Sequence, residues 1–263
     1  MIKFSYITIT YNAEATLPAT VASIMRQQYP CIEHIIVDGC STDNTLNIAK
    51  QYQEESRIAD NGHEIKIVSE PDKGIYDAMN KGLAMATGHY LCFLNAGDSL
   101  PYSLQIAAIA NMLQQDTDNS DIATFPAVIY GETNLVDESR RYLGKRHLSP
   151  PKHLNWQSFK QGMLVCHQSF YARRDIAQKN KYNLAYRHSA DFDWCIRVMK
   201  TADEMGCSFM NTGMVLTDYL NEGHTTKNHK SSLIERYHIM CKYYGTLPTI
   251  LRHLWFFLRN LTK

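Results

Sequence analysis

Short apolar runs alternate with amphipathic stretches along the first hundred residues of the chain. The runs have the length and β-branched content of strands, and the stretches between them place apolar residues three and four positions apart, as one helix face does. The sequence predicts strands at Phe4–Thr10, His34–Val37, Ile65–Val68 and Tyr90–Leu94, and helices around Leu17–Met25, after Ser41–Thr45, at Ile75–Ala86 and at about Ser103–Gln115. This alternation predicts right-handed βαβ units and a mostly parallel sheet flanked by helices, an α/β fold.

The second half of the chain is less regular. The sequence predicts strands at Ile122–Tyr130 and Met163–Tyr171, a charged hairpin or loop at Val136–Leu148, and a helix at Phe192–Met199. The helix is predicted because apolar residues recur there at i, i+3, i+4 and i+7. We expect one domain over residues 1–226, followed by a helical extension over residues 227–263.

Polar residues directly follow the predicted strands of the first half. In open α/β sheets the ligand lies outside the carboxyl ends of the strands. We therefore expect these polar groups to converge on one crevice. They are Tyr11–Asn12, Asp38, Glu70–Asp72 and Asn95–Asp98.

Composition narrows the class of protein. The 263 residues are 44% apolar and 20% charged, which are globular values and exclude long-range disorder. The formal net charge of +1 argues against a general nucleic-acid binder. Seven cysteines without a CxxC pair indicate reduced thiols in a cytosolic protein, and we see neither a secretory leader nor a membrane-spanning run.

Motifs for several common chemistries are absent from the sequence. It contains no GxGxxG, GxxxxGK[ST], HExxH or GxSxG pattern, so neither a dinucleotide site nor a P-loop is expected. What remains is a set of acids at strand ends. Asp38 could accept a hydrogen bond from a nucleobase or a ribose hydroxyl; alternatively, it shapes a turn while Asp43 caps the next helix.

The run Asn95–Asp98 follows an apolar strand. Gly97 allows close approach of the backbone, and Asp98, expected to be exposed, offers hard oxygen ligands for Mg²⁺ or Mn²⁺. The alternative is an ordinary turn before the next helix.

Two acids, Asp191 and Asp193, stand at the start of the helix predicted around Phe192–Met199. Acids are favoured there by capping and by the helix dipole, so a structural role is one interpretation. The other is that one of them is a general base, which would need burial or a neighbouring carboxylate to raise its pKa.

Six segments together resemble family-2 glycosyltransferases, which have the GT-A nucleotide-diphospho-sugar transferase fold. They cover roughly Lys3–Lys200 in the family's order and spacing, and the nearest subset assembles bacterial exopolysaccharide, capsule or O-antigen. The segments are SYITITYN from Ser5, VDGCSTDNT from Val37, EPDKGIYDAMNKG from Glu70, GHYLCFLNAGD from Gly88, HQSFY from His167 and SADFDWCIR from Ser189.

The resemblance implies a role for each matching residue. Thr10 and Tyr11 would line the nucleobase pocket, Asp38 would bind the base, and Asp72 would lie by the ribose or diphosphate. Asp98 would bind Mg²⁺ or Mn²⁺, and Asp191 would be the catalytic base. The other donor-binding residues implied are Asn12, Lys81, Asn95, Ala96 and Gly97.

Two positions depart from the family's pattern. Asn95 occupies the first position of the DxD-type motif, so the identity of the metal is open, and Ala190 stands where many relatives carry Glu. Further residues are candidates for contacts with the acceptor or the phosphates, although a lone His or Trp is more often structural. These candidates are Trp156, His167, Gln168, Asp193 and His224.

The tail from Lys227 onward carries seven Lys and Arg residues and one acid, together with several aromatic residues. Basic residues with interfacial aromatics are typical of a segment that lies on a membrane surface. The alternative is a helix packed on the domain with a solvated basic face. The first interpretation predicts a cytoplasmic protein attached peripherally to the inner face of the cell membrane.

Together these observations favour an inverting glycosyltransferase that moves a sugar from a nucleotide-diphosphate sugar, most simply a UDP-sugar, to a glycan or lipid-linked acceptor. A nucleotidyltransferase is one alternative, but Thr8–Glu14 lacks a glycine-rich basic loop. A non-catalytic sugar-nucleotide or glycan-binding module is another, and the presence of both Asp98 and Asp191 argues against it.

Overall fold

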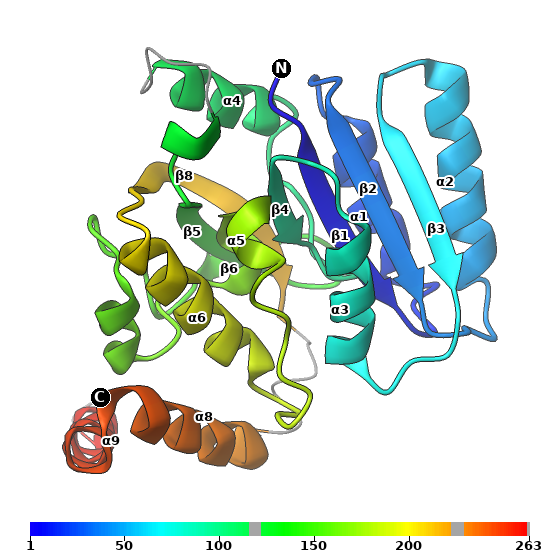
Figure 1. Cartoon of the computed structure of the whole chain (residues 1–263). Coiled ribbons are helices and arrows are strands. Elements are labelled where there is room, and N and C mark those ends of the chain that lie inside the picture. The colour runs from blue at the N-terminus through cyan, green and yellow to red at the C-terminus, as the bar shows by residue number, and fades with distance from the viewer. Residues whose placement is uncertain (116–121, 222–228, 262–263) are drawn as a thin grey trace.

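The computed structural model describes residues 1–115, 122–221 and 229–261, with an eight-stranded sheet at its centre (Figure 1). The strand order is β3-β2-β1-β4-β7-β5-β6, with β8 paired to β5. The strands are β1 (Phe4–Thr10), β2 (Ile32–Asp38), β3 (Glu64–Ser69), β4 (Tyr90–Phe93), β5 (Val128–Val136), β6 (Tyr142–Lys145), β7 (Phe170–Arg173) and β8 (Phe209–Leu220).

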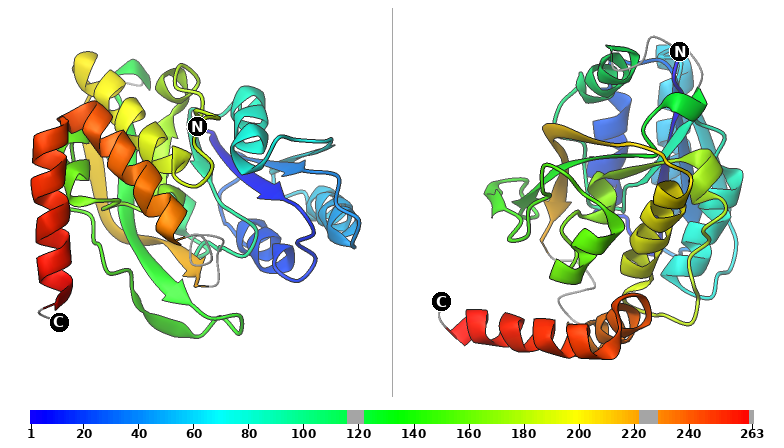
Figure 2. Two further views of the ribbon diagram at one scale, coloured as in Figure 1. Left: turned by 90° about the horizontal axis from the view of Figure 1, so that it is seen from below. Right: turned by 60° about the vertical axis from the view of Figure 1, so that its left-hand side comes forward.

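Helices cover both faces of this sheet. Helices α1 and α2 lie on one face and α3 and α6 on the other, as the view from below shows (Figure 2). The helices are α1 (Leu17–Met25), α2 (Thr45–Ala59), α3 (Ile75–Met85), α4 (Gln105–Gln115), α5 (Arg174–Ala177), α6 (Ala190–Glu204), α8 (His229–Tyr244) and α9 (Thr246–Leu261), with short 3₁₀ turns η1 (Ile122–Thr124), η2 (Trp156–Gln161) and η3 (His167–Ser169).

The first four strands confirm the predicted fold class. β1 pairs in parallel with β2 and β4, and β2 pairs in parallel with β3. The register places Thr10 beside Asp38 and Asp38 beside Ser69. The carboxyl ends of three neighbouring strands therefore form one row of polar side chains, as the sequence predicts.

Two predicted strands of the second half are wrong in position. Residues 122–124 form η1, and β5 begins only at Val128, because Pro126 lacks an N–H and restricts the residue before it. Most of the segment predicted as a strand at Met163–Tyr171 is loop and 3₁₀ turn, and β7 begins at Phe170. The apolar residues before β7 are buried by packing against the core and not by strand pairing.

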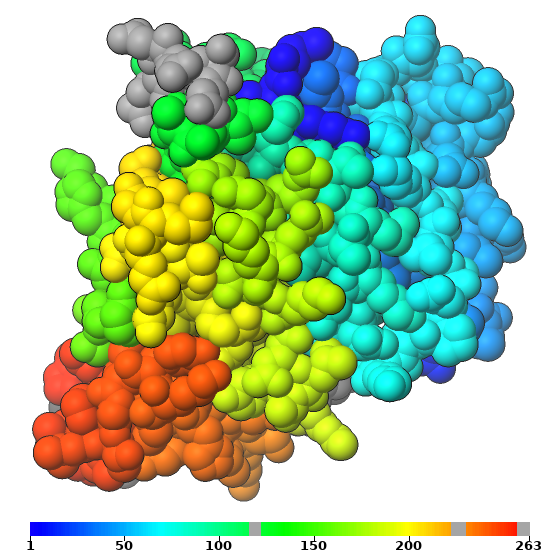
Figure 3. Space-filling model, in the orientation of Figure 1, coloured from blue at the N-terminus to red at the C-terminus, as the bar shows by residue number. Residues whose placement is uncertain are grey.

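Helices α8 and α9 form a hairpin (Figure 2), which lies at one end of the molecule (Figure 3). α8 packs against α6 and η2, and α9 also reaches η2. Within the described ranges, no helix combines the length and apolarity needed to cross a bilayer.

Candidate functional site

The polar row at the carboxyl ends of β1, β2 and β3 is built around Asp38. Its carboxylate is buried and accepts hydrogen bonds from Thr10 Oγ1 (3.1 Å), Ser69 Oγ (2.7 Å), and the backbone N–H and hydroxyl of Ser41 (3.0 and 2.5 Å). Burial raises the pKa of this acid, but these donors outweigh burial and leave the pKa lowered. Asp38 therefore shapes the loop, and its predicted bond to a nucleobase stays a prediction.

Tyr11 and Asp72 meet above Gly39. A Cβ atom on Gly39 would lie 2.6 Å from Asp72 Oδ2 and 3.5 Å from the Tyr11 ring, so no side chain fits between them. The Tyr11 side chain is 67% exposed. An exposed ring beside a carboxylate, over bare backbone, is suited to stacking a base and binding a ribose.

Two further candidates organise the loops of this pocket. Asn12 has φ +48° and accepts a hydrogen bond from Thr42 N through its side chain (2.9 Å), which ties the loop after β1 to the loop after β2. Lys81 Nζ lies 2.8 Å from Glu70 Oε1 and donates to Pro71 O at 2.7 Å. Lys81 therefore holds the segment that carries Asp72.

Asp98 is buried, not exposed as the sequence interpretation assumes. Only 4% of it is accessible, and its carboxylate accepts hydrogen bonds from Leu220 N (3.0 Å) and Gln168 Nε2 (2.9 Å). The cause of this burial is β8, whose last residues lie against the turn after β4; a Cβ atom on Gly97 would lie 2.9 Å from Leu220 Cδ2. Burial raises the pKa of Asp98 to about 6 in spite of both hydrogen bonds.

The turn Asn95–Asp98 fits a divalent cation. Asp98 N donates to Asn95 O at 2.9 Å and closes the turn, while Ala96 and Gly97 form its backbone. Asn95 Oδ1 is buried without a hydrogen-bond partner among the described residues, and the Asp98 carboxylate lacks a cationic hydrogen-bond partner there. Across those residues no cluster of three His, Cys, Asp or Glu side chains occurs, but Mg²⁺ is usually held by one or two carboxylates plus substrate phosphates.

Asp191 lies in the first turn of α6, with its side chain 16% exposed. Tyr76 OH donates to its Oδ1 at 3.2 Å, and His167 Nδ1 lies 3.4 Å from its Oδ2. Burial raises the pKa of Asp191, but the hydrogen bond and charge of His167, followed by the charge of Arg236, outweigh burial and lower it. The raised pKa that a general base at this position would need is therefore not found, because the hydrogen bond and the charges around Asp191 favour its ionised form.

The turn η3 joins the two acids. His167 contacts Asp191, and the next residue, Gln168, donates to Asp98. His167 Nε2 is buried and has no hydrogen-bond partner in the described part of the chain. Asp191 and Asp98, predicted as the base and the metal ligand, are thus connected through two consecutive residues, and a buried ring nitrogen without a described partner lies beside them.

The remaining candidates lie elsewhere. The Trp156 ring stacks on Tyr244 of α8, with centroids 5.8 Å apart. Asp193 is fully buried and accepts hydrogen bonds from Arg197 Nε (2.7 Å) and Tyr243 OH (2.8 Å), so it ties α6 to α8. His224 falls outside the described residues.

Sequence reasoning missed several residues of the site. Tyr76 contacts Asp191, the charges of Arg140 and Arg236 act on Asp98 and Asp191, and Leu220 closes over Asp98. Tyr76 lies inside the segment EPDKGIYDAMNKG, which resembles the family, but the resemblance assigns no role to this tyrosine. The others come from segments with no motif, and only the fold brings them to the site.

Comparisons with known proteins identify the family of the chain. The model of the family "Glycosyl transferase family 2" matches residues 5–180. A PGL/p-HBAD biosynthesis glycosyltransferase of Mycobacterium bovis is 36% identical over 195 residues, which cover 74% of this chain and 68% of that protein.

Solved structures share the fold. TarS of S. aureus, residues 1–349 in complex with UDP-GlcNAc, superposes with a TM-score of 0.67 at 16% identity, covering 91% of this chain and 64% of that one. The mannosyltransferase PcManGT of Pyrobaculum calidifontis, in complex with GDP-Man and Mn²⁺, superposes with a TM-score of 0.61 at 14% identity, covering 95% and 74%.

Proposed function

The chain belongs to glycosyl transferase family 2 and is a glycosyltransferase, and we propose that it moves a sugar from a nucleoside-diphosphate sugar to a hydroxyl of a glycan acceptor with inversion at the anomeric carbon. One observation carries this proposal: two consecutive residues of η3 contact the two acids. Gln168 donates a hydrogen bond to the buried Asp98, and His167 lies against Asp191. That is the arrangement a single displacement needs, with the leaving group at one acid and the nucleophile at the other.

In the proposed reaction Asp191 accepts the proton of the acceptor hydroxyl while that oxygen attacks the anomeric carbon. The bond from the anomeric carbon to the diphosphate oxygen breaks, and the nucleoside diphosphate leaves with the electron pair. The lowered pKa of Asp191 leaves the carboxylate ionised at neutral pH but makes it a weaker base, so it takes the proton as the acceptor oxygen bonds to the anomeric carbon and becomes acidic. Tyr76 and His167 hold the carboxylate in one orientation.

Asp98 and Asn95 would hold Mg²⁺ or Mn²⁺. When bound, such an ion neutralises the negative charge that develops on the departing diphosphate. PcManGT, a structural neighbour, was solved with Mn²⁺, which supports divalent-metal use here. For the donor we favour UDP over GDP and dTDP; the TarS complexes with UDP and UDP-GlcNAc agree with that choice, whereas PcManGT was solved with GDP-Man.

A panel of radiolabelled nucleotide sugars, incubated with the protein, candidate acceptors and Mg²⁺ or Mn²⁺, tests the reaction. We expect a labelled glycan and free nucleoside diphosphate. Release of pyrophosphate would identify a nucleotidyltransferase instead, and nucleotide-sugar binding without turnover would identify a binding module. Titration calorimetry with UDP, GDP and dTDP tests the donor, and binding to none of them would refute the pocket.

We further propose that the acceptor is lipid-linked and that the α8–α9 hairpin attaches the protein to the inner face of the cell membrane. Apolar residues of α9 recur on one face at i, i+3, i+4 and i+7, and Leu247 and Leu251 are 68% and 60% exposed. Arg252 on the same helix supplies positive charge. Apolar burial combined with attraction to anionic lipid is how such helices bind a bilayer.

Co-sedimentation with anionic vesicles tests the attachment. The triple variant Leu247→Ser, Leu251→Ser and Leu254→Ser should stay in the supernatant, and high salt should weaken binding of the wild-type protein because screening shortens the attraction. Leu104→Ser removes an equally exposed leucine away from the hairpin and serves as the control. Equal partitioning of the triple variant and the wild type would return the hairpin to a purely structural role.

A further inference from the structure

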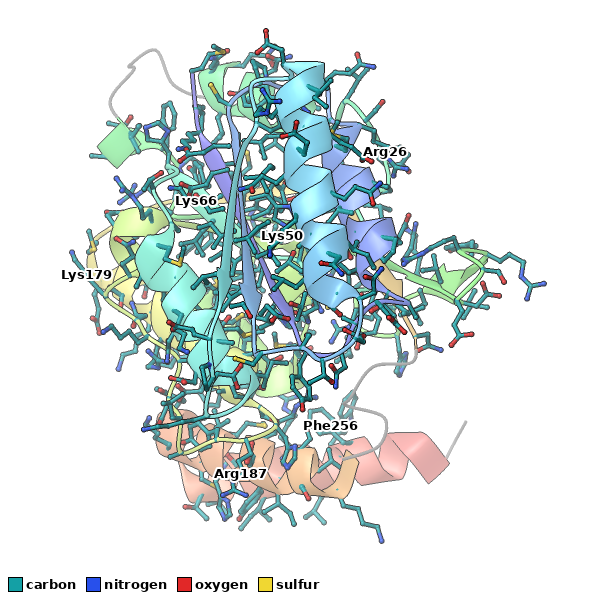
Figure 4. All side chains as sticks on the ribbon, turned by 90° about the vertical axis from the view of Figure 1, so that its right-hand side faces the viewer. Arg26, Lys50, Lys66, Lys179, Arg187 and Phe256 are labelled. Carbon is teal, nitrogen blue, oxygen red and sulfur yellow. The ribbon has the colours of Figure 1, made fainter. Side chains whose placement is uncertain are left out.

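The loop that leads into α6 is held by a carboxylate from another helix. Glu235 of α8 accepts hydrogen bonds from three consecutive backbone N–H groups, those of Arg187 (2.8 Å), His188 (2.8 Å) and Ser189 (2.9 Å). The view that labels Arg187 shows this loop lying directly against α8 (Figure 4). A carboxylate that accepts several N–H groups before a helix is a strong, charge-assisted anchor.

The residue that precedes α6 is also engaged with α8. Ser189 is the N-cap residue of α6, yet its side chain makes no capping hydrogen bond. Its hydroxyl instead lies 2.9 Å from Ser232 Oγ and donates to Ser232 O at 3.2 Å. Both anchors of the α6 N-terminus therefore come from one turn of α8.

Arg236, the next residue of α8, packs against Phe192, the residue that follows Asp191. Its guanidinium lies 6.0 Å from the centre of the Phe192 ring, and its Nε is buried with no hydrogen-bond partner among the described residues. Its positive charge also acts directly on the Asp191 carboxylate. Glu235 thus fixes the backbone up to two residues before Asp191, and Arg236 packs on the residue after it.

The attachment of α8 does not depend on these two residues alone. Tyr243 OH donates to the buried Asp193 at 2.8 Å, and Tyr244 OH donates to Trp156 O at 2.7 Å. Ile239 and Met240 of α8 are buried in the main core cluster. A change at Glu235 should therefore loosen the α6 N-terminus without detaching the helix.

We propose that α8 is part of the catalytic centre, with Glu235 and Arg236 as positioning residues that set the place and orientation of the Asp191 carboxylate. The inference rests on the proposed role of Asp191 as the base. The family model matches residues 5–180, so the residues that make these contacts lie outside the matched segment. Misplacement of a reacting group by about 1 Å costs on the order of 10²-fold in rate.

Steady-state kinetics of single variants test the proposal. Glu235→Gln, which places an amide among three N–H donors, should lower kcat by about 10- to 100-fold, while the KM for the donor and the Kd for UDP stay unchanged. Arg236→Met should also lower kcat, and Arg236→Lys should restore most of it because the positive charge is retained. Glu204→Gln makes the same acid-to-amide change at the exposed end of α6 and should behave as wild type.

A measurement independent of turnover completes the test. Amide hydrogen exchange over residues 187–193 should accelerate in Glu235→Gln and stay at the wild-type rate in Glu204→Gln. Exchange that is unchanged in Glu235→Gln, or a kcat equal to that of the wild type, would overturn the positioning role. Absence of transfer by the wild-type protein would instead refute the proposed function, and the exchange result would still decide whether α8 holds this loop.

Discussion

Two buried carboxylates at opposite ends of the sheet have opposite electrostatic environments. Glu33, near the amino ends of the strands, is fully buried and lies 2.6 Å from Lys66 Nζ, with Lys3 Nζ at 3.5 Å. Ser5 and Thr87 donate further hydrogen bonds to it. Burial raises the pKa of Glu33, but these donors outweigh burial and lower it to about 2.

Asp98, at the carboxyl ends, is almost as buried, but among the described residues it accepts two hydrogen bonds, both from neutral donors, and its pKa is raised to about 6. In the described part of the chain, two lysines therefore lie against Glu33, whereas Asp98 has no cationic hydrogen-bond partner and the charge of Arg140 does not offset its burial. The first arrangement stabilises the sheet, whereas the second costs stability and creates a place for a cation. A buried acid whose pKa is raised by desolvation is a candidate functional residue, and Asp98 at the carboxyl ends of the strands is such an acid.

The largest expected effect is on kcat, and it comes from a variant at the carboxyl ends of the strands. Asp191→Asn should lower kcat by roughly 10²- to 10⁴-fold, because the amide cannot accept the proton of the acceptor. The melting temperature and the Kd for UDP should change little, since Asp191 is partly exposed and outside the donor pocket. Steady-state kinetics and calorimetry measure both.

Asp193→Asn is the matched control for that variant. The Asp193 carboxylate accepts hydrogen bonds from Arg197 and Tyr243 and does not face the candidate site. The variant should therefore lower the melting temperature more than it lowers kcat. A dead Asp193→Asn variant with an active Asp191→Asn variant would show that the base is assigned to the wrong residue.

At the amino end the expected effect is on stability. Glu33→Gln should lower the free energy of unfolding by about 3 kcal/mol, since a pKa shift of one unit corresponds to about 1.4 kcal/mol and the folded pKa lies near 2 against an ordinary 4.5. Urea unfolding at pH 7 measures it, with the Kd for UDP as a check that the site is intact.

The pH dependence of this contribution has a definite sign. The folded pKa is the lower one, so the stability from Glu33 is present above about pH 5 and is lost as the pH falls toward 2. Glu33→Gln should flatten this acid limb, and a limb identical to that of the wild type would show that Glu33 is not its source.

Asp98 should show the opposite sign and a slightly smaller effect. Its folded pKa is the higher one, so the metal-free protein should lose stability as the pH rises from about 4 to 6. Asp98→Asn should remove that loss and stabilise the metal-free protein by about 3 kcal/mol at pH 7, since the folded pKa of about 6 lies about two units above the ordinary 3.8, while sugar transfer is lost. Thermal unfolding in EDTA measures the gain in stability. A lower melting temperature in Asp98→Asn than in the wild type would contradict the view that the buried Asp98 carboxylate costs stability.

The smallest effect concerns the donor pocket. Gly39→Ala would place a methyl group 2.6 Å from Asp72 Oδ2, so Asp72 must shift. We expect the Kd for UDP to rise by about tenfold, which corresponds to about 1.4 kcal/mol. Titration calorimetry checks this, with the Kd for UDP of the wild-type protein as the reference. An unchanged Kd in Gly39→Ala would place the nucleotide elsewhere.

The sequence predicted the amino-terminal half of the fold well because local pattern and tertiary role coincide there. Strand β1 was predicted with the bounds that the structure gives, and β4 to within a residue, since short apolar runs ended at polar turns. The convergence of Thr10, Asp38 and Asp72 followed from parallel pairing alone.

The rest depended on contacts that no local pattern encodes. β8 was not predicted because Phe209–Leu220 contains Asn211 and Gly213, and its pairing with β5 shifts register twice. The burial of Asp98 follows from β8, so it could not be anticipated either. The lowered pKa of Asp191 depends on His167 and Arg236, which are distant from it in sequence.

The hydrogen bond from Leu220 N to Asp98 has a consequence for synthesis of the chain on the ribosome. The two residues are 122 positions apart, so Asp98 leaves the ribosome well before the strand that covers it. At about 5–20 residues per second, roughly 6–24 s separate the two events. During that interval strands β1, β2, β3 and β4 of the nascent chain can pair, but the turn Asn95–Asp98 lacks the strand that covers it. The finished geometry of the site is therefore among the last features to form as the protein is made.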